Sequence, residues 1–158
     1  MSTDGQRWRN LLIPFIVITV DRITKYFALA HCRGGCSLNS FLSLDLTFNR
    51  GISWGIFNHT TNAAFLAVTT LVLIITIGLV AYTIRCWHAG APIWAELLVL
   101  GGSFSNLFDR FFHGGVVDFI LISYGNYSWP MFNFADICIV LGVGAMVFDV
   151  YKREWNKS

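Results

Sequence analysis

The stretch 63–84, AAFLAVTTLVLIITIGLVAYTI, decides the fold because it contains no charged side chain. At about 1.5 Å per helical residue its length is roughly 33 Å, which is enough to cross the hydrocarbon core of a bilayer. The whole chain has 158 residues, of which 55% are hydrophobic and 13% are charged. Soluble domains average about 25% charged residues. The sequence therefore predicts a single integral membrane domain over residues 1–158.

Three further segments have the length of a membrane-spanning helix, although each contains ionisable residues. They are 11–30, 93–112 and 133–151. Together with 63–84 they predict an all-α membrane protein with four transmembrane helices. The net charge of +2 is small, so we expect no nucleic-acid partner. We expect the protein to be a monomer in contact with membrane lipid.

The distribution of lysine and arginine predicts the orientation of these helices. Four spans place the N-terminus, loop 85–92 and the C-terminus on one side of the membrane. That side holds Arg7, Arg9, Arg85, Lys152, Arg153 and Lys157. The loops on the other side hold Arg33 and Arg50. Because cytoplasmic loops are enriched in basic residues, we predict that both termini are cytoplasmic and that the two long loops lie outside.

The two long loops contain strand patterns rather than featureless linkers. In 42–49 apolar and polar residues alternate, which is the period of a half-buried strand. Segment 116–122, VVDFILI, is a second strand candidate. After residues 49–51 come Trp54, Ile56 and Phe57, and aromatic residues favour the membrane interface. We therefore predict a small β-rich platform, built from about 37–62 and 116–130, on the outer face of the helices.

Polar residues gather at the outer ends of three predicted spans. In 93–112 they are Asn106, Asp109 and Arg110, at i, i+3 and i+4 on one helix face, with His113 one turn further. Gly101 and Gly102 precede them and would let another helix approach closely. Carboxylates in hydrocarbon are costly and usually mark function, so this gathering predicts a site.

The first and last spans contribute polar pairs at the same depth. Asp21 and Lys25 are spaced i,i+4 with the acid first, which favours an ion pair. Asn133 followed by Asp136 is typical of a helix start, with Asn as N-cap and an acid at N3. Each pair also has a purely structural interpretation, either as a local salt bridge or as a complement to a helix dipole. So many buried polar groups at one depth favour a shared functional site.

Asp118 and Asp136 are the strongest candidates for acid–base chemistry. Asp118 follows strand-like residues and Asp136 begins a helix, so both are expected to be rigidly held. Two carboxylates that share a site do not both ionise easily, so one keeps a proton. The charged member can then deprotonate water while the protonated member donates to a carbonyl oxygen. The positive end of the last helix favours charge on Asp136, which we take as the ionised member.

Two other sequence patterns suggest sites that differ from this carboxylate pair. Residues 51–55 fit the G-x-S-x-G pattern of serine hydrolases, but that elbow requires a central sheet and a partnered histidine. His31, Cys32 and Cys36 have spacings that zinc ligands also use. Because these cysteines are predicted to lie outside, a disulfide or free thiols are better interpretations than a metal site.

Five segments, in order along the chain, resemble the motifs of one protein family. They are Asp21-Arg22-Ile23-Thr24-Lys25, Asn49-Arg50-Gly51-Ile52-Ser53-Trp54-Gly55, Gly101-Gly102-Ser103-Phe104-Ser105-Asn106-Leu107-Phe108-Asp109-Arg110, Gly115-Val116-Val117-Asp118-Phe119-Ile120 and Phe132-Asn133-Phe134-Ala135-Asp136. On these residues the chain resembles bacterial lipoprotein signal peptidases (signal peptidase II), which are four-span membrane aspartic proteases. Ser105 stands where that family often has glycine.

The resemblance implies roles for the polar residues described above. It implies that Asp118 and Asp136 are the catalytic dyad. It implies that a second group supports the dyad or binds substrate, namely Asn49, Asn106, Arg110 and Asn133. It implies that a third group is structural, namely Asp21, Lys25 and Asp109.

The resemblance also implies the substrate and the setting. The substrate would be a prolipoprotein whose cysteine carries a diacylglyceryl group, cut just before that cysteine, without a metal or an organic cofactor. The enzyme would be a multi-pass protein of the bacterial cytoplasmic (inner) membrane with its site at the outer, periplasmic face. Two alternatives use the same residues differently: a small transporter with the acids as a proton relay, and a structural membrane subunit without chemistry.

Overall fold

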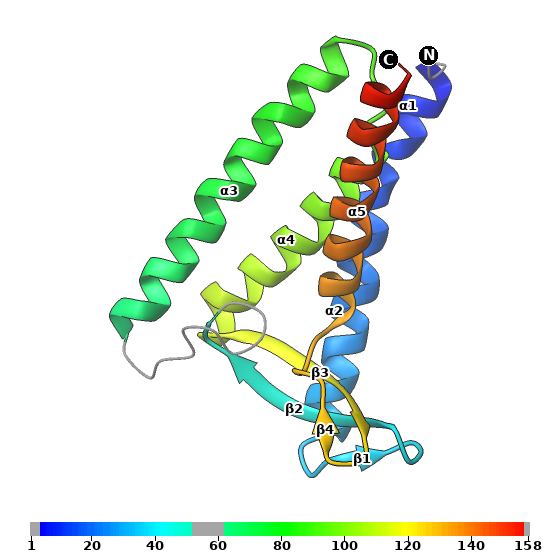
Figure 1. The fold of residues 1–158 in the computed structure, drawn as a ribbon. Coiled ribbons are helices and arrows are strands. Elements are labelled where there is room, and N and C mark those ends of the chain that lie inside the picture. The colour runs from blue at the N-terminus through cyan, green and yellow to red at the C-terminus, as the bar shows by residue number, and fades with distance from the viewer. Residues whose placement is uncertain (1–3, 52–61, 157–158) are drawn as a thin grey trace.

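The computed structural model describes residues 4–51 and 62–156. Within these ranges a bundle of helices carries a small sheet at one end, and both termini lie at the opposite end (Figure 1). The helices are α1 (Asp4–Asn10), α2 (Leu12–His31), α3 (Asn62–His88), α4 (Trp94–His113) and α5 (Phe134–Trp155). The strands are β1 (Cys36–Ser37), β2 (Leu42–Asn49), β3 (Val116–Tyr124) and β4 (Tyr127–Ser128).

Helix α4 organises the bundle, because α2, α3 and α5 all pack against it. Two glycines of α4 make this packing close, as the sequence predicts. A Cβ atom on Gly102 would lie 2.6 Å from the carbonyl oxygen of Ala135 in α5, and one on Gly101 would lie 2.9 Å from Cβ of Val17 in α2. Glycine at these positions therefore sets how near α2 and α5 come to α4.

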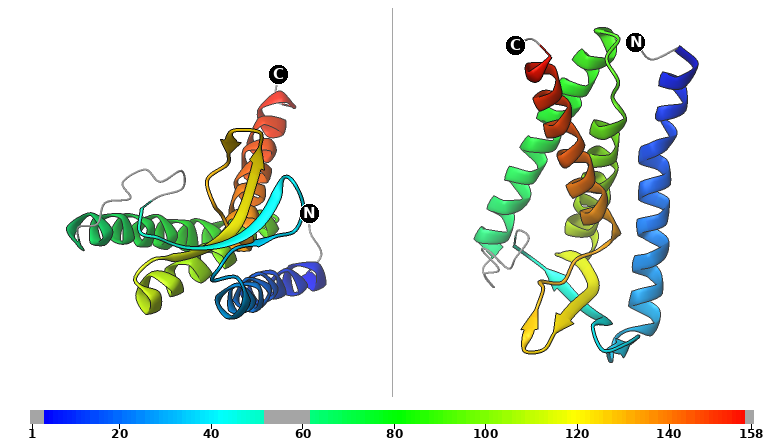
Figure 2. Two further views of the ribbon diagram at one scale, coloured as in Figure 1. Left: turned by 90° about the horizontal axis from the view of Figure 1, so that it is seen from below. Right: turned by 45° about the vertical axis from the view of Figure 1, so that its right-hand side comes forward.

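Helix α3 is the least embedded of the long helices. It diverges from α5 toward the sheet end of the molecule (Figures 1 and 2). Large apolar side chains such as Leu66, Ile74 and Ile77 are about 60% exposed on its surface. Among the described residues two helical stretches, Asn62–His88 and Phe134–Lys152, are long and apolar enough to cross a membrane by length and composition. A total of four spans remains a prediction.

The sheet is antiparallel with the strand order β1-β2-β3-β4. The long pair β2–β3 places Leu44 opposite Ile120 and Thr47 opposite Asp118, with an irregularity between these two positions. Gly114, in the left-handed conformation with φ of 67°, ends α4 and lets the chain turn directly into β3. The outer end of α4 and the start of β3 are thereby held next to each other.

Most of the predicted elements are present, with small shifts at their ends. The four long helices match the predicted segments, and β2 and β3 match the predicted strands. The short helix α1 and the two-residue strands β1 and β4 were not predicted. Trp54, Ile56 and Phe57, proposed above as interfacial residues of the platform, lie outside the described residues.

Candidate active site

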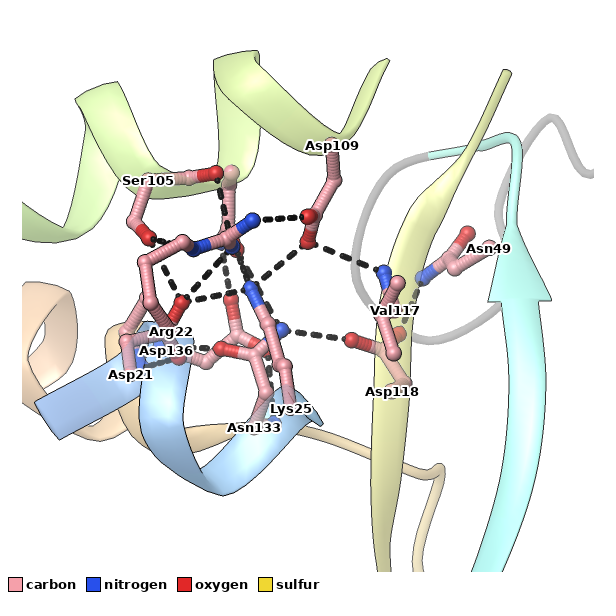
Figure 3. Close-up of polar contacts among 12 residues, drawn as sticks. Asp21, Arg22, Lys25, Asn49, Ser105, Asp109, Val117, Asp118, Asn133 and Asp136 are labelled. Carbon is pink, nitrogen blue, oxygen red and sulfur yellow. Dashed lines mark hydrogen bonds and ion pairs between the residues drawn. The ribbon is translucent and has the colours of Figure 1, made fainter. Parts of the chain in front are cut away.

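A network of polar side chains fills the junction between the helix ends and the sheet (Figure 3). Its inner part is a cluster of four charged residues from α2 and α4: Asp21, Arg22, Lys25 and Asp109. The Nζ atom of Lys25 lies 2.8 Å from Oδ2 of Asp21 and 2.7 Å from Oδ2 of Asp109. Both carboxylates are fully buried at 0% exposure. The predicted i,i+4 pair of Asp21 and Lys25 is therefore confirmed, and Asp109 joins it from another helix.

Two members of this network were not identified from the sequence, Arg22 and Ser105. The guanidinium of Arg22 binds Asp109 at 2.6 Å and Asp21 at 3.1 Å. The Ser105 hydroxyl donates to Oδ2 of Asp21 at 2.6 Å and accepts from Nε of Arg22 at 3.1 Å. Ser105, the departure from the glycine of the resembled family, therefore adds a hydrogen bond between α4 and α2.

The charged cluster also holds the backbone beside each acid of the proposed dyad. Oδ2 of Asp109 accepts a hydrogen bond from the N–H of Val117 at 3.1 Å, directly before Asp118. Oδ1 of Asp21 accepts one from the N–H of Ala135 at 2.9 Å, directly before Asp136. Since the charges of two cations and two carboxylates balance, the cluster fixes β3 and α5 without net charge.

Asp136 lies in the first turn of α5 in the arrangement that the sequence predicts. The backbone N–H of Asn133 donates to Oδ2 of Asp136 at 3.1 Å, and the N–H of Asp136 donates to Oδ1 of Asn133 at 2.9 Å. This reciprocal pair is a capping box, which satisfies donors that a helix start leaves unpaired. Nδ2 of Asn106 donates to the other oxygen, Oδ1, at 2.8 Å. The Asp136 carboxyl is thus held on both oxygens.

Asp118 projects from β3 toward α5 and is 2% exposed. Nδ2 of Asn49 on β2 donates to its Oδ2 at 3.0 Å, and Nδ2 of Asn133 donates to its Oδ1 at 2.7 Å. The β2–β3 register explains the first contact, because Asn49 lies two residues beyond Thr47, the cross-strand partner of Asp118. Each carboxyl oxygen keeps a second lone pair, which leaves room for a proton.

Asn133 and Asn106 join the two carboxyl groups into one site. Asn133 binds Asp118 through its side chain and Asp136 through its backbone, and its Nδ2 also lies 3.3 Å from Oδ1 of Asn106. That same oxygen of Asn106 accepts from Nζ of Lys25 at 2.8 Å. Lys25 therefore orients the Asn106 amide so that its nitrogen faces Asp136.

The surroundings of Asp118 favour its protonated form. Burial raises the pKa of the Asp118 carboxyl to about 7, and the nearby Asp136 carboxyl adds to this rise. Hydrogen bonds from Asn49 and Asn133 and the charge of Lys25 oppose it. A carboxyl that holds a proton near neutral pH, beside a second carboxyl, is equipped for general acid–base chemistry.

Arg110 lies at the edge of the site and binds backbone rather than a carboxylate. It is 6% exposed, and its guanidinium donates to the carbonyl oxygens of Arg50, at 3.4 Å, and Gly51. Its helix neighbour Asp109 binds Lys25 and Arg22 instead. Arg110 thereby anchors the chain directly after β2.

The two carboxyl groups line one cavity of about 580 Å³. Asn49, Asn106 and Arg110 supply further polar lining near them. Much of the remaining wall is apolar and comes from α3, α5 and the segment before α5: Val72, Trp129, Pro130, Met131, Phe132, Ile137, Ile139, Val140 and Leu141. The cavity thus extends from a polar site at the sheet into the apolar part of the bundle.

The two alternative sites suggested by the sequence are the set of His31, Cys32 and Cys36 and the G-x-S-x-G segment. In the described residues neither is assembled around this cavity. Cys32 and Cys36 are free thiols, one buried and one exposed. Nδ1 of His31 lies 3.1 Å from the carbonyl oxygen of Phe27 in its own helix. Of the G-x-S-x-G segment only Gly51 lies within the described residues. His113 is exposed beside Phe48, in agreement with a surface role.

Comparison with known proteins adds independent information to this geometry. Residues 13–152 match the family model described as signal peptidase (SPase) II. The lipoprotein signal peptidase of Rickettsia conorii is 35% identical over 153 residues, which cover 92% of this chain and 74% of the relative. The lipoprotein signal peptidase of Francisella tularensis subsp. mediasiatica is 33% identical over 148 residues, which cover 88% of this chain and 89% of the relative.

Two solved structures, both titled as a bacterial membrane enzyme, have the same fold. One is 27% identical in sequence with a TM-score of 0.77, and the match covers 95% of this chain and 92% of the solved chain. The other is 26% identical with a TM-score of 0.71, and the match covers 90% of this chain and 92% of the solved chain. The similarity of fold thus extends over nearly the whole chain, including the helices and the sheet.

Proposed function

The chain belongs to the signal peptidase II family of bacterial membrane aspartic proteases, and we propose that it removes signal peptides from prolipoproteins. Cleavage occurs just before a cysteine that carries a diacylglyceryl group. The observation that carries this proposal is the pair of carboxyls, Asp118 and Asp136, held by a shared asparagine in one cavity that continues into the apolar part of the bundle.

The proposed reaction uses the two carboxyl groups in different protonation states. Asp136, at the positive end of α5, is the ionised member and takes a proton from the attacking water. Asp118 holds a proton and donates it to the oxygen of the scissile carbonyl. The resulting tetrahedral intermediate collapses when Asp136 passes its proton to the leaving amide nitrogen and Asp118 takes back a proton from one hydroxyl of the intermediate, which restores the resting dyad. The hydrogen bonds from Asn49, Asn106 and Asn133 keep both carboxyls in position throughout.

We infer that the helices α2, α3, α4 and α5 all span the membrane and that both termini are cytoplasmic. In this arrangement the site lies at the outer membrane surface. The position of both termini opposite the sheet supports this arrangement (Figure 1). A lipid-anchored substrate presents its scissile bond at that depth, while its acyl chains extend along the apolar wall formed by α3 and α5. Each buried CH₂ contributes about 0.8 kcal/mol, so the diacylglyceryl group supplies much of the binding free energy.

A lipopeptide assay tests the proposal directly. Purified protein in detergent micelles or nanodiscs is incubated with a synthetic peptide that carries a diacylglyceryl cysteine and with the same peptide lacking the lipid. We expect cleavage before the lipidated cysteine, with kcat/KM at least about 100-fold higher than for the unlipidated peptide, because buried acyl chains add several kcal/mol of binding. Equal cleavage of both peptides, or no cleavage of either, would refute the proposal.

The pKa of Asp118 predicts how the activity depends on pH. Because Asp118 is protonated below about pH 7 and ionised above it, the site loses its proton donor as the pH rises. We expect kcat/KM to fall above about pH 7, approaching about tenfold per pH unit. The measurement is the pH profile of lipopeptide cleavage, with carboxyl titration by NMR as its control. If Asp118 titrated as the more acidic of the two groups, the assigned roles would be reversed.

A further inference from the structure

The segment between β4 and α5 has strand-like backbone pairing with β3 on one side. The N–H of Phe132 donates to the carbonyl oxygen of Ile120 at 3.1 Å, and the N–H of Ile120 donates to that of Phe132 at 2.9 Å. In an extended chain the N–H and C=O groups of successive residues point to opposite sides. Because Phe132 faces β3, the backbone groups of Met131 and Asn133 face away from it.

The side that faces away from β3 is the side on which the Asp136 carboxyl lies. The N–H of Asn133 shows this, since it donates to Oδ2 of Asp136. The N–H and C=O of Met131 point the same way, and among the described residues neither has a hydrogen-bond partner. Met131 is half-buried and lines the cavity that contains both carboxyls. An unpaired donor and acceptor in such a place are the features of an edge that binds another strand.

The chain directly after β2, where Gly51 also lines the cavity, offers no such pair at its described residues. The N–H of Gly51 donates to Oδ1 of Asn49 at 3.0 Å, and the carbonyl oxygens of Arg50 and Gly51 accept from Arg110. These backbone groups, which directly follow β2, are thereby occupied. Met131 therefore has the unpaired backbone donor and acceptor next to the carboxyl pair.

We propose that the main chain of Met131 binds an extended segment of the substrate peptide as an added β-strand, an inference that rests on the proposed function. The N–H of Met131 donates to one carbonyl oxygen of the peptide, and the C=O of Met131 accepts from the N–H of the same peptide residue. Because Met131 lines the same cavity as both carboxyls, the paired residue lies close in sequence to the bond that is cut. Recognition through main-chain groups lets the enzyme accept different side chains at that residue.

Lipopeptides with single N-methylated amides test this geometry without altering the enzyme. Each peptide carries a single N-methyl group. The modified amide lies before the scissile bond in some peptides and after it in others, and the scissile amide itself is never modified. We expect one position to lower kcat/KM about tenfold through KM, because its N–H pairs with Met131. Both neighbouring positions, whose N–H groups point away, are the matched controls and should change by less than about twofold. A scan with equal effects at all positions would overturn the inference.

Selective labelling of methionine with ¹⁵N gives a second readout that does not depend on turnover. The chain contains 3 methionines, and the amide of Met146, inside α5, serves as an internal control. A non-cleavable lipopeptide is expected to slow hydrogen exchange of the Met131 amide and to shift its proton resonance downfield, while Met146 stays unchanged. A saturated complex in which the Met131 amide does not respond would overturn the inference.

These outcomes are separable from failure of the proposed function. If the unmodified lipopeptide is not cleaved by the wild-type protein, the proposed function itself is wrong. The unmodified lipopeptide can instead be cleaved while every N-methyl position changes kcat/KM equally and the Met131 amide shows no change in hydrogen exchange or chemical shift. In that case the protease assignment stands and the substrate binds without pairing to Met131.

Discussion

Replacing either Asp118 or Asp136 by asparagine is expected to lower kcat for lipopeptide cleavage by about 10³-fold or more. A positioned general acid or base typically contributes about 10² to 10⁴-fold, and an amide can neither take the proton of water nor supply one to a carbonyl oxygen. Asparagine has nearly the shape of aspartate, so the cavity keeps its volume. Both oxygens of Asp118 accept from amide donors, so Asp118→Asn replaces one acceptor by a donor and also loses one hydrogen bond.

Asp149→Asn is the matched control, because Asp149 is a half-buried aspartate of the same helix as Asp136 at its opposite end. We expect this variant to cleave the lipopeptide at nearly the wild-type rate. Circular dichroism and thermal unfolding establish that each variant is folded before its rate is interpreted. Activity retained within about tenfold in a folded Asp118→Asn or Asp136→Asn variant would contradict the acid–base assignment.

Replacing Lys25 by glutamine is expected to lower the free energy of unfolding by about 3 kcal/mol or more. The substitution leaves Asp21 and Asp109 fully buried with Arg22 as their remaining cation, and breaking a buried ion pair on one side typically costs about 3–5 kcal/mol. It also removes the hydrogen bond that orients Asn106 toward Asp136, so activity should fall as well.

Thermal unfolding in detergent micelles measures the stability effect, with Arg33→Gln as the control. Arg33 is exposed on the loop after α2, and its Nε donates to the carbonyl oxygen of Leu29 within the same turn. Exposed substitutions of this kind usually change stability by less than about 0.5 kcal/mol. If Lys25→Gln and Arg33→Gln unfolded at the same temperature, the charged cluster would not contribute to stability in the way described.

The elements of the fold were largely predictable because they depend on local sequence patterns. Long apolar segments predicted the four long helices, and the alternation in 42–49 predicted β2. Helix α1 is short and polar, and the two-residue strands β1 and β4 depend on pairing with neighbours, so none of them has a periodic signal. The strand β3 was recognised, but its length beyond Ile122 was not.

The site was predictable only where a contact lies within one element. The i,i+4 pair of Asp21 and Lys25 and the capping box of Asn133 and Asp136 follow from spacing along a helix. The contacts of Arg22 and Ser105 join α2 to α4, so they depend on how two helices pack. A charged residue next to Asp21 in a buried segment was the available signal for Arg22. The pairing of Asp118 with Asp136 was inferred from their predicted place at one end of the helices, whereas Asn49 was assigned to the site only through the family resemblance.

The hydrogen bond from the N–H of Ala135 to Asp21 has a consequence for biogenesis, because the two residues are separated by 114 positions. The ribosome makes α2 long before it has made the start of α5. During that interval the carboxylate of Asp21 has its basic partners on its own helix but lacks the amide that completes its coordination. Maturation of the site therefore waits for the last helix, and a nascent chain halted before residue 134 holds an unfinished polar cluster.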